Sequence, residues 1–311
     1  MRALNTFAEL LATPMGEPMT RLAMLVLALL IPATPTFAQT IKDFLAQVRQ
    51  YWDTPTEPFR IIGNVYYVGT KGLASYLITS PDGNVLIDTV MPGNTEKITT
   101  NIEKLGFKIS DVKLLVNTHA HLDHTGGFAE LKKASGAQMV SGTKDKPLLE
   151  SGTYPGREDV VDLQFPPVTV DRTVNDGDVL TLGPIKLVAH ATPGHSPGCT
   201  TWTMDVKENG EDHGIIFFCS GTVALNQLVG TPTYPGIVED YRRTLETAGE
   251  IKGDVLLAPH PEMYDMEKKR AAITPGAPNP FVKPGEFQTY LAKLKSDFDE
   301  GLAKQSAQQT K

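Results

Sequence analysis

One stretch of sequence decides the fold: VKLLVNTHAHLDHTGG, residues 112–127. Its apolar first part, Val112–Val116, predicts a buried strand. Three histidines and an aspartate follow within residues 119–124, directly after this strand. Such side chains are poor material for a hydrophobic core, whereas neutral imidazoles and carboxylates are good zinc ligands. The stretch therefore predicts a metal site at the end of a strand.

The spacing inside this stretch indicates more than one metal ion. A single zinc ion rarely takes all four of its ligands from so short a loop. The two-residue step from His119 to His121 suits one metal. Asp123 and His124 are then free to face a second metal.

Two further histidines lie in loops that follow predicted strands. His195 lies in TPGHSPG, residues 192–198, and His260 lies in APHP, residues 258–261. Because the sites of open α/β sheets collect at strand ends, we expect both side chains to contribute to the metal sites. Taken alone, each would be interpreted as a structural histidine, but the cluster at 119–124 favours metal binding.

The two remaining histidines, His190 and His213, are not expected to bind metal. His190 lies within a predicted strand, two residues before the loop that begins at Thr192. We interpret His190 as a structural residue or as a residue that supports the metal ligands without binding metal itself. His213 lies in a polar hairpin loop, so we expect it to be solvated.

Outward from the motif, the pattern alternates between strands and helices, which predicts one compact α/β domain over about residues 45–305. This domain belongs to a mature chain of residues 39–311, whose polar tail after Ala303 is expected to fray. Residues 81–83 (PDG) predict a hairpin turn, and residues 207–214 a second hairpin loop. The expected strands are 65–68, 74–79, 84–87, 112–116, 138–141, 179–182, 185–191, 200–205, 215–219 and 254–258, and the expected helices begin near 94, 127, 238 and 284.

The N-terminus has the pattern of a secretory signal. Arg21 precedes the apolar run 22–31, and the small residues Thr36 and Ala38 flank Phe37, which predicts cleavage after Ala38. The alternative is a membrane anchor, but the run is roughly half the ~20 residues that a spanning helix needs. We therefore expect a periplasmic or secreted protein without membrane contact after cleavage, whether translation starts at Met1 or Met19.

The net charge and the composition limit the kinds of molecule that the protein is expected to bind. The net charge is −7 and no basic patch stands out, which argues against nucleic-acid binding. Hydrophobic residues make up 41% of the chain, enough for a large core. We expect a monomer that acts on a small molecule.

The chain contains two cysteines, Cys199 and Cys219, so it is not a disulfide scaffold even though export implies an oxidising compartment. If the hairpin between them folds about residues 209 and 210, the two lie nearly opposite on neighbouring strands. We interpret them as small buried thiols, with a cross-strand disulfide as the alternative.

The motif HAHLDHTGG at residues 119–127 resembles the HxHxDH signature of the metallo-β-lactamase superfamily. Further segments resemble subclass B3 of the metallo-β-lactamases, and the likeness extends over about residues 50–305. These segments are residues 51–80, 192–202, 234–242 and 254–261. The resemblance implies a four-layer αβ/βα sandwich of the α/β class, with the site between its two halves.

The resemblance also implies two Zn²⁺ ions per chain. The first would be held by His119, His121 and His195, and the second by Asp123, His124 and His260. Subclass B1 has no histidine at the position of His124 and uses a cysteine at the second zinc, so His124 favours B3. Cys219 adjoins the position of that cysteine, which leaves it as an alternative zinc ligand.

Two hydroxyl residues and one glycine complete what the resemblance implies. Ser220 and Thr222 would hydrogen-bond the carboxylate of the substrate. Gly253 stands where the first cysteine of the familiar B3 disulfide is expected.

The implied reaction is hydrolysis of the β-lactam amide bond, and hence antibiotic resistance. A zinc-bound hydroxide attacks the lactam carbonyl in the di-zinc site, while Asp123 binds metal and orients that hydroxide. The nearest alternatives are a lactonase or a glyoxalase-type thioesterase, which normally need a bridging aspartate where this chain has Cys219 and Ser220. A zinc-storage protein is the alternative without catalysis, although three ligands per zinc would leave open positions for water and substrate.

Overall fold

The computed structural model describes residues 37–309. The chain divides into two compact units with the boundary after Lys42, and the fold below concerns the second unit. The predicted signal segment, residues 1–38, lies outside the described residues except for its last two, which begin helix α2 (Phe37–Trp52). Within the described part, no helix is long and apolar enough to cross a membrane.

The first sheet contains seven strands in the order β1 to β7. Strands β1 to β4 pair antiparallel, and β4 to β7 pair parallel. The predicted turn at residues 81–83 joins β3 to β4, and Gly83 adopts a φ of 124° there. The strands are β1 (Phe59–Ile62), β2 (Val65–Tyr67), β3 (Tyr76–Ile78), β4 (Asn84–Ile87), β5 (Val112–Val116), β6 (Gln138–Gly142) and β7 (Arg172–Val174).

The second sheet contains five strands in the order β12-β11-β10-β9-β8. Strands β8 to β11 pair antiparallel, and β12 joins β11 in parallel. Because β9, β11 and β12 therefore run in the same direction, the loops after them meet at one edge of the sheet. The strands are β8 (Val179–Leu182), β9 (Ile185–Ala191), β10 (Thr200–Glu208), β11 (Glu211–Phe217) and β12 (Val255–Leu257).

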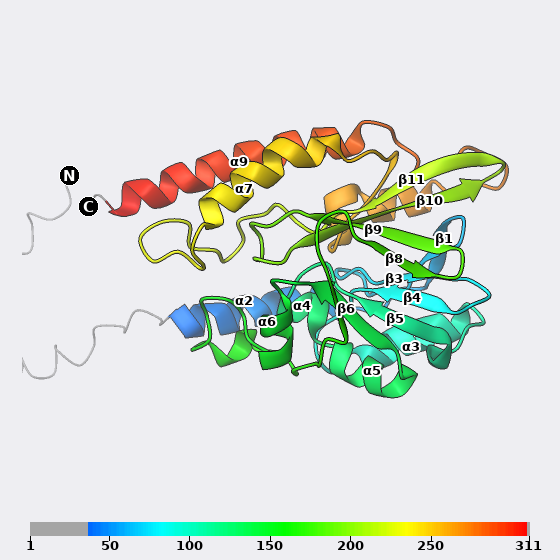
Figure 1. The fold of residues 1–311 in the computed structure, drawn as a ribbon, viewed down its shortest axis with the longest axis horizontal. Coiled ribbons are helices and arrows are strands. Elements are labelled where there is room, and N and C mark those ends of the chain that lie inside the picture. Colours follow the sequence, from blue (N-terminus) through cyan, green and yellow to red (C-terminus); the bar gives the residue numbers. More distant parts are fainter. Residues whose placement is uncertain (1–36, 310–311) are drawn as a thin grey trace, which may run out of the picture. The chain divides into compact units, whose positions relative to one another are not determined.

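Helices cover the outer faces of both sheets. Figure 1 shows α3 and α5 against the first sheet, α7 and α9 against the second, and the two sheets face to face between them. The expected four-layer αβ/βα sandwich is confirmed. The helices are α3 (Thr95–Lys104), α4 (Leu122–Thr125), α5 (Phe128–Ser135), α6 (Lys146–Ser151), α7 (Ile237–Thr247), α8 (Met266–Ala271) and α9 (Glu286–Gln309), with 3₁₀ turns η1 (Ile109–Asp111), η2 (Val161–Leu163), η3 (Ala248–Glu250) and η4 (Pro261–Tyr264).

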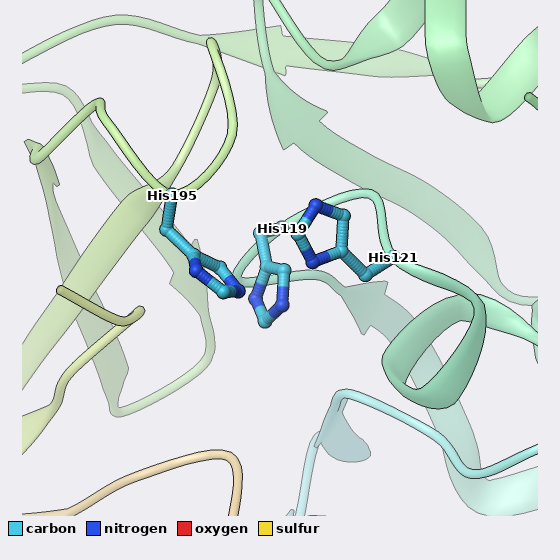
Figure 2. A group of neighbouring side chains, drawn as sticks. All are labelled: His119, His121 and His195. Atoms are coloured by element: carbon cyan, nitrogen blue, oxygen red, sulfur yellow. The ribbon is translucent and has the colours of Figure 1, made fainter. Parts of the chain in front are cut away.

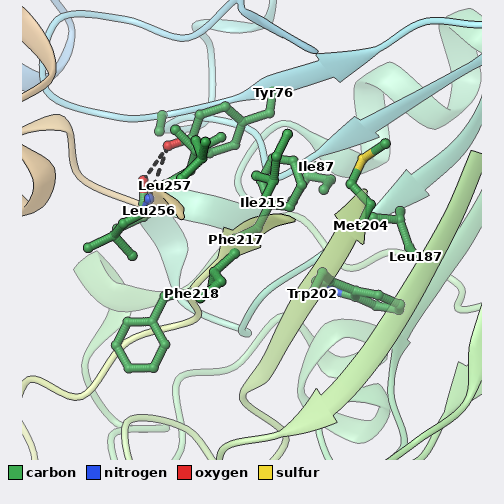
Figure 3. Close-up of a cluster of buried hydrophobic side chains, with 14 of the residues drawn as sticks. Tyr76, Ile87, Leu187, Trp202, Met204, Ile215, Phe217, Phe218, Leu256 and Leu257 are labelled. Atoms are coloured by element: carbon green, nitrogen blue, oxygen red, sulfur yellow. Dashed lines mark hydrogen bonds between the residues drawn. The ribbon is translucent and has the colours of Figure 1, made fainter. Parts of the chain in front are cut away.

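The core lies between the sheets and ties them together near the predicted site (Figure 3). Trp202 on β10 is fully buried, and its indole nitrogen donates a hydrogen bond of 3.0 Å to the Asn117 carbonyl, just after β5. Tyr76 on β3 donates a hydrogen bond of 2.6 Å to the Ala258 carbonyl, just after β12. Burying each such side chain contributes on the order of 2 kcal/mol, and the two bonds fix strand ends of opposite sheets relative to each other.

The second predicted hairpin loop is wrong. Strands β10 and β11 stay paired until Glu208 and Glu211, so the turn is only Asn209 and Gly210. Both residues have positive φ values, 53° and 90°, as a tight Asn-Gly hairpin turn requires. The residues on either side of the turn occupy exposed strand positions and are therefore polar. This polarity led to the prediction of a longer loop.

Two further expectations from the sequence are corrected, one for His213 and one for the C-terminal tail. His213 lies on β11 rather than in a solvated loop, and its Nδ1 is 2.8 Å from Oδ2 of Asp254. The tail after Ala303 does not fray, because α9 continues to Gln309. The side chain of Gln305 accepts a hydrogen bond from the Leu228 amide and donates one to the Asn226 carbonyl, which anchors the last turns.

Candidate metal centre

The first group of candidate ligands is three buried histidines, whose ring nitrogens lie within 4.8 Å of one another. His119 and His121 come from the loop after β5, and His195 comes from the loop after β9. Figure 2 shows the three rings converging on one point. Each sheet thus supplies part of this candidate group, and each of the three histidines lies in a loop that follows a strand.

Hydrogen bonds leave one ring nitrogen of His119 and of His195 free for a metal. The Thr118 hydroxyl donates its proton to Oδ2 of Asp88 at 2.6 Å, so its oxygen accepts from Nδ1 of His119 at 3.0 Å. Nδ1 of His195 donates to the Thr222 carbonyl at 2.7 Å. Nε2 of His119 is then buried without any partner, as is Nε2 of His121.

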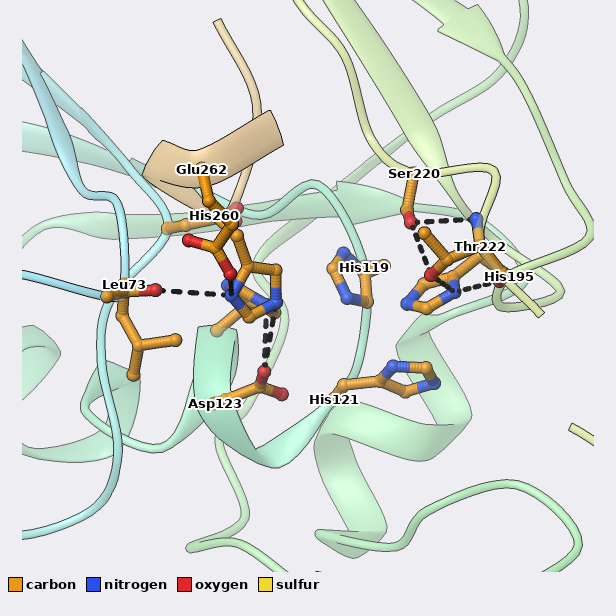
Figure 4. Close-up of polar contacts among 12 residues, drawn as sticks. Leu73, His119, His121, Asp123, His195, Ser220, Thr222, His260 and Glu262 are labelled. Carbon is orange, nitrogen blue, oxygen red and sulfur yellow. Dashed lines mark hydrogen bonds and ion pairs between the residues drawn. The ribbon is translucent and has the colours of Figure 1, made fainter. Parts of the chain in front are cut away.

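The second group is Asp123, His124 and His260. Asp123 and His124 lie on the short helix α4, which turns them away from the loop that carries His119 and His121. Oδ2 of Asp123 is 3.1 Å from Nε2 of His124 and 3.4 Å from Nε2 of His260 (Figure 4), and the two nitrogens are 3.2 Å apart. Ligand atoms about 2.1 Å from a tetrahedral metal lie about 3.4 Å apart, so these three separations match one shared ion.

The protonation states also suit metal binding. Burial and the neighbouring imidazoles lower the pKa of His119 and of His121 well below the usual value. Burial lowers the pKa of His195 to about 4. Burial opposes ionisation of Asp123, but His124 and His260 outweigh it and hold its pKa well below the usual value. Neutral imidazoles and an ionised carboxylate are the forms that bind a divalent transition metal, so the residues fit such an ion.

A cavity of about 360 Å³ opens over both groups. This size lies within the range of small-molecule sites. One side presents the hydroxyl residues Ser220 and Thr222, with the ligands at the base. The remaining wall is apolar and is formed by Phe44, Leu45, Trp52, Leu122, Tyr154, Leu163, Ala224, Leu225, Pro259 and Met263.

The cysteines pair with each other, which corrects the interpretation as free thiols. Cys199 and Cys219 form a disulfide with a Cα–Cα distance of 5.8 Å, and no described cysteine is free. The hairpin does turn at residues 209 and 210, so the strand argument had placed the two correctly. Because its sulfur is bonded to Cys199, Cys219 stands outside both candidate groups and is not a metal ligand here.

Sequence reasoning missed two residues that shape the site. Tyr154 stacks on His121 with ring centroids 4.2 Å apart and is almost fully buried. Asp145 is buried and contacts the loops of both His121 and His195. The sequence carried no clear signal for Asp145, because it stands between two lysines in a stretch that resembles a solvated surface. His190, expected to be a structural residue or a support behind the ligands, lies on β9 with its Nε2 2.9 Å from the Thr203 hydroxyl.

Comparison with known proteins identifies the family. The family model of the metallo-β-lactamase superfamily matches residues 69–208. The structure of the subclass B3 metallo-β-lactamase BJP-1 of Bradyrhizobium japonicum is 61% identical, with a TM-score of 0.83, over 84% of this chain and 98% of that one. The chain belongs to the metallo-β-lactamase superfamily. The FEZ-1 metallo-β-lactamase of Legionella gormanii is 39% identical, with a TM-score of 0.78, over 81% of this chain and 98% of that one.

Hydroxyacylglutathione hydrolases are also similar to this chain. A hydroxyacylglutathione hydrolase of Brucella ovis is 30% identical over 71% of this chain and 72% of its own length. For the hydroxyacylglutathione hydrolase of Rhodospirillum rubrum, at 33% identity, the match spans about a third of either chain. The protein is therefore a hydrolase of the metallo-β-lactamase fold with two candidate metal sites and a cavity for a small molecule.

Proposed function

We propose that the protein hydrolyses the amide bond of β-lactam antibiotics with two bound Zn²⁺ ions, as an enzyme of the subclass B3 type. The observation that carries the proposal is the ligand set: three histidines in one group, and Asp123, His124 and His260 in the other. The second group contains no cysteine, because Cys219 is held in a disulfide. The likeness to BJP-1 over nearly its whole length supports the same assignment.

Zinc supplies, when bound, an activated water molecule near neutral pH and a Lewis acid for the lactam carbonyl. The protein supplies the geometry. Asp123 accepts a hydrogen bond from the attacking water and so aims it at the carbonyl carbon. The hydroxyls of Ser220 and Thr222, 3.3 Å apart, bind the carboxylate of the antibiotic. The apolar wall around Trp52 and Tyr154 packs against the acyl side chain and excludes water.

Three ligands in each group leave room for water and substrate, which favours catalysis over zinc storage. A second candidate function is hydrolysis of a glutathione thioester or a lactone, because hydroxyacylglutathione hydrolases are similar in sequence. Ser220 stands beside the disulfide where those enzymes would need a bridging aspartate, so we rank this candidate second.

The proposal also covers the location of the protein, its oligomeric state and its effect on the cell. We propose that residues 1–38 are a signal peptide, that the chain from Gln39 functions as a monomer in the periplasm or outside the cell, and that it confers β-lactam resistance. Intact-mass measurement of the exported protein should give a chain that begins at Gln39. Size-exclusion chromatography with light scattering should give the mass of one chain.

The direct test is to purify the chain from Gln39, measure bound zinc, and follow carbapenem absorbance with and without a chelator. Rapid loss of absorbance that the chelator abolishes and zinc restores is the expected result. Parallel assays with a glutathione thioester and a lactone provide the comparison. Two bound zinc ions with thioester or lactone hydrolysis but no turnover of penicillin, cephalosporin or carbapenem would move the assignment to the second candidate.

A further inference from the structure

We propose that Asp145 is a positioning residue that holds the loop of His119 and His121 at the correct distance from the loop of His195. The inference rests on the metal-binding part of the proposed function, and it extends that proposal to a residue that binds neither metal nor substrate.

The Asp145 carboxylate joins two loops that are distant in sequence. Oδ2 accepts hydrogen bonds of 2.8 Å from the Ala120 amide and of 2.8 Å from the Ser196 hydroxyl. Oδ1 accepts one of 2.7 Å from the Gly198 amide. Ala120 lies between His119 and His121, and Ser196 follows His195 directly. One side chain therefore bonds the backbone between His119 and His121 and, through Ser196 and Gly198, the loop of His195.

The placement of Asp145 is specific to this task. It occupies the N-cap position of α6, where an aspartate usually bonds the first turn of its own helix. The Asp145 side chain makes no such bond within α6 and instead accepts hydrogen bonds from the two loops. The contact is also tight: a Cβ on Gly198 would stand 2.3 Å from the Asp145 amide nitrogen and 2.6 Å from Cγ.

Only a carboxylate satisfies all three donors. It offers acceptor positions on both oxygens, whereas an asparagine amide offers one oxygen and turns an NH₂ group toward a backbone or hydroxyl donor. Asp145 is completely buried, and its three donors are uncharged. A buried carboxylate that is not paired with a cation is costly, so its contribution is to geometry rather than to stability.

The two metal groups should respond differently to loss of this carboxylate. The three side-chain hydrogen bonds of Asp145 reach Ala120, between His119 and His121, and Ser196 and Gly198, which follow His195 by one and three residues. Asp123 and His124 lie in helix α4, which begins directly after His121 and makes no side-chain hydrogen bond with Asp145. His260 is held by a hydrogen bond from its Nδ1 to the Gly72 carbonyl at 3.2 Å. The first group should therefore lose metal affinity while the second keeps most of it.

The test measures zinc affinity by competition with a chromophoric chelator, using the mature chain from Gln39. In D145N, one of the two zinc equivalents should bind about 10- to 100-fold more weakly, as is typical when the support of a metal ligand is lost. S196A keeps the carboxylate but removes one of its donors, and should weaken the same equivalent by a smaller factor. D171N is the matched control, because Asp171 bonds the Met139 amide at 2.7 Å in the adjacent strand region but contacts no ligand loop.

The outcomes separate the inference from the proposed function. Wild-type affinity for both equivalents in S196A and in a folded D145N would overturn the positioning role. An equal loss of both equivalents, or a lower unfolding temperature of the metal-free chain with unchanged zinc affinity, would also overturn it, since a purely structural role predicts those results. Weakened binding of one equivalent in a protein that hydrolyses no β-lactam would keep the inference and reject the proposed reaction. A wild-type chain that binds no zinc would overturn both.

Discussion

Nδ1 of His195 lies 2.7 Å from the carbonyl oxygen of Thr222. A carbonyl can only accept, so the ring proton is on Nδ1 and the opposite nitrogen faces the cavity. The same carbonyl accepts a hydrogen bond of 2.7 Å from the Tyr241 hydroxyl. The loop that carries the two hydroxyls proposed to bind substrate thus also orients a candidate metal ligand, so substrate binding and metal geometry should be tested with variants that separate them.

Ser220 offers that separation. Its hydroxyl lies 3.3 Å from the Thr222 hydroxyl and, among the described residues, makes no hydrogen bond to a candidate metal ligand. If it binds the substrate carboxylate, S220A should raise KM for a carbapenem about 10-fold with little change in kcat, because a hydrogen bond to a charged group contributes about 1.5 kcal/mol in both ground and transition states. Steady-state kinetics measure this. The control substrate is the methyl ester of the same antibiotic, for which wild type and S220A should have the same KM.

Asp123 should affect turnover rather than affinity. If Asp123 binds zinc and aims the attacking water as proposed, kcat of D123A should fall by at least about 100-fold, a larger effect than on KM. The control is E262Q, because Glu262 is half exposed and its carboxylate lies 3.9 Å from Nδ1 of His260. Screening by solvent should make E262Q nearly silent. Near-normal turnover in D123A would reject the assigned role.

The disulfide should stabilise the fold without taking part in metal binding. Cys199 and Cys219 are 20 residues apart in sequence, and closing a loop of that length contributes about 3 kcal/mol in the chain-entropy account. C199S/C219S should lower the free energy of unfolding by about that amount in urea titrations. The variant should still bind two zinc equivalents. Loss of one equivalent would instead mean that a cysteine is a ligand.

Asp145 should make the stability of the metal-free chain depend on pH in an unusual direction. Burial raises its pKa from 3.8 to about 6, and its three hydrogen bonds only partly oppose this. Since the folded state holds this proton more tightly than the unfolded state, the contribution of Asp145 to stability decreases as pH rises from about 4 to about 6. Its hydrogen-bond donors are uncharged, and Asp145 also helps to raise the pKa of Tyr234, after burial, Asp240 and Tyr241.

A comparison with D145N isolates this effect, because that variant cannot titrate at position 145 and the histidines titrate in both proteins. The free energy of unfolding of wild type minus that of D145N should decrease by up to about 3 kcal/mol between pH 4 and pH 7. Urea unfolding of both metal-free proteins at several pH values measures it. A difference that stays constant or grows with pH would mean that Asp145 is ionised in the fold at a normal or lowered pKa.

The sequence by itself determined the strand that ends at Val116, the ligand cluster after it and the four-layer sandwich that its family resemblance implied. These features could be predicted because they are local: an apolar run buries itself, and four polar ligands within six residues have few other uses. His195 and His260 could be predicted because each follows a strand directly, and strand ends of one direction meet at one edge.

Tertiary structure alone decided the features that depend on contacts between distant segments. Asp145 lies 51 residues before Ser196 in sequence, and nothing in its lysine-rich surroundings indicates burial between two loops. The stacking of Tyr154 on His121 and the contact of His213 with Asp254 are of the same kind. The sequence placed Cys199 opposite Cys219 and left the disulfide as an alternative, which the tertiary structure decided. The type of a residue determines which hydrogen bonds its side chain can make. Which partner it bonds depends on how the sheets and loops pack, because burial removes the water molecules that would otherwise be its hydrogen-bond partners.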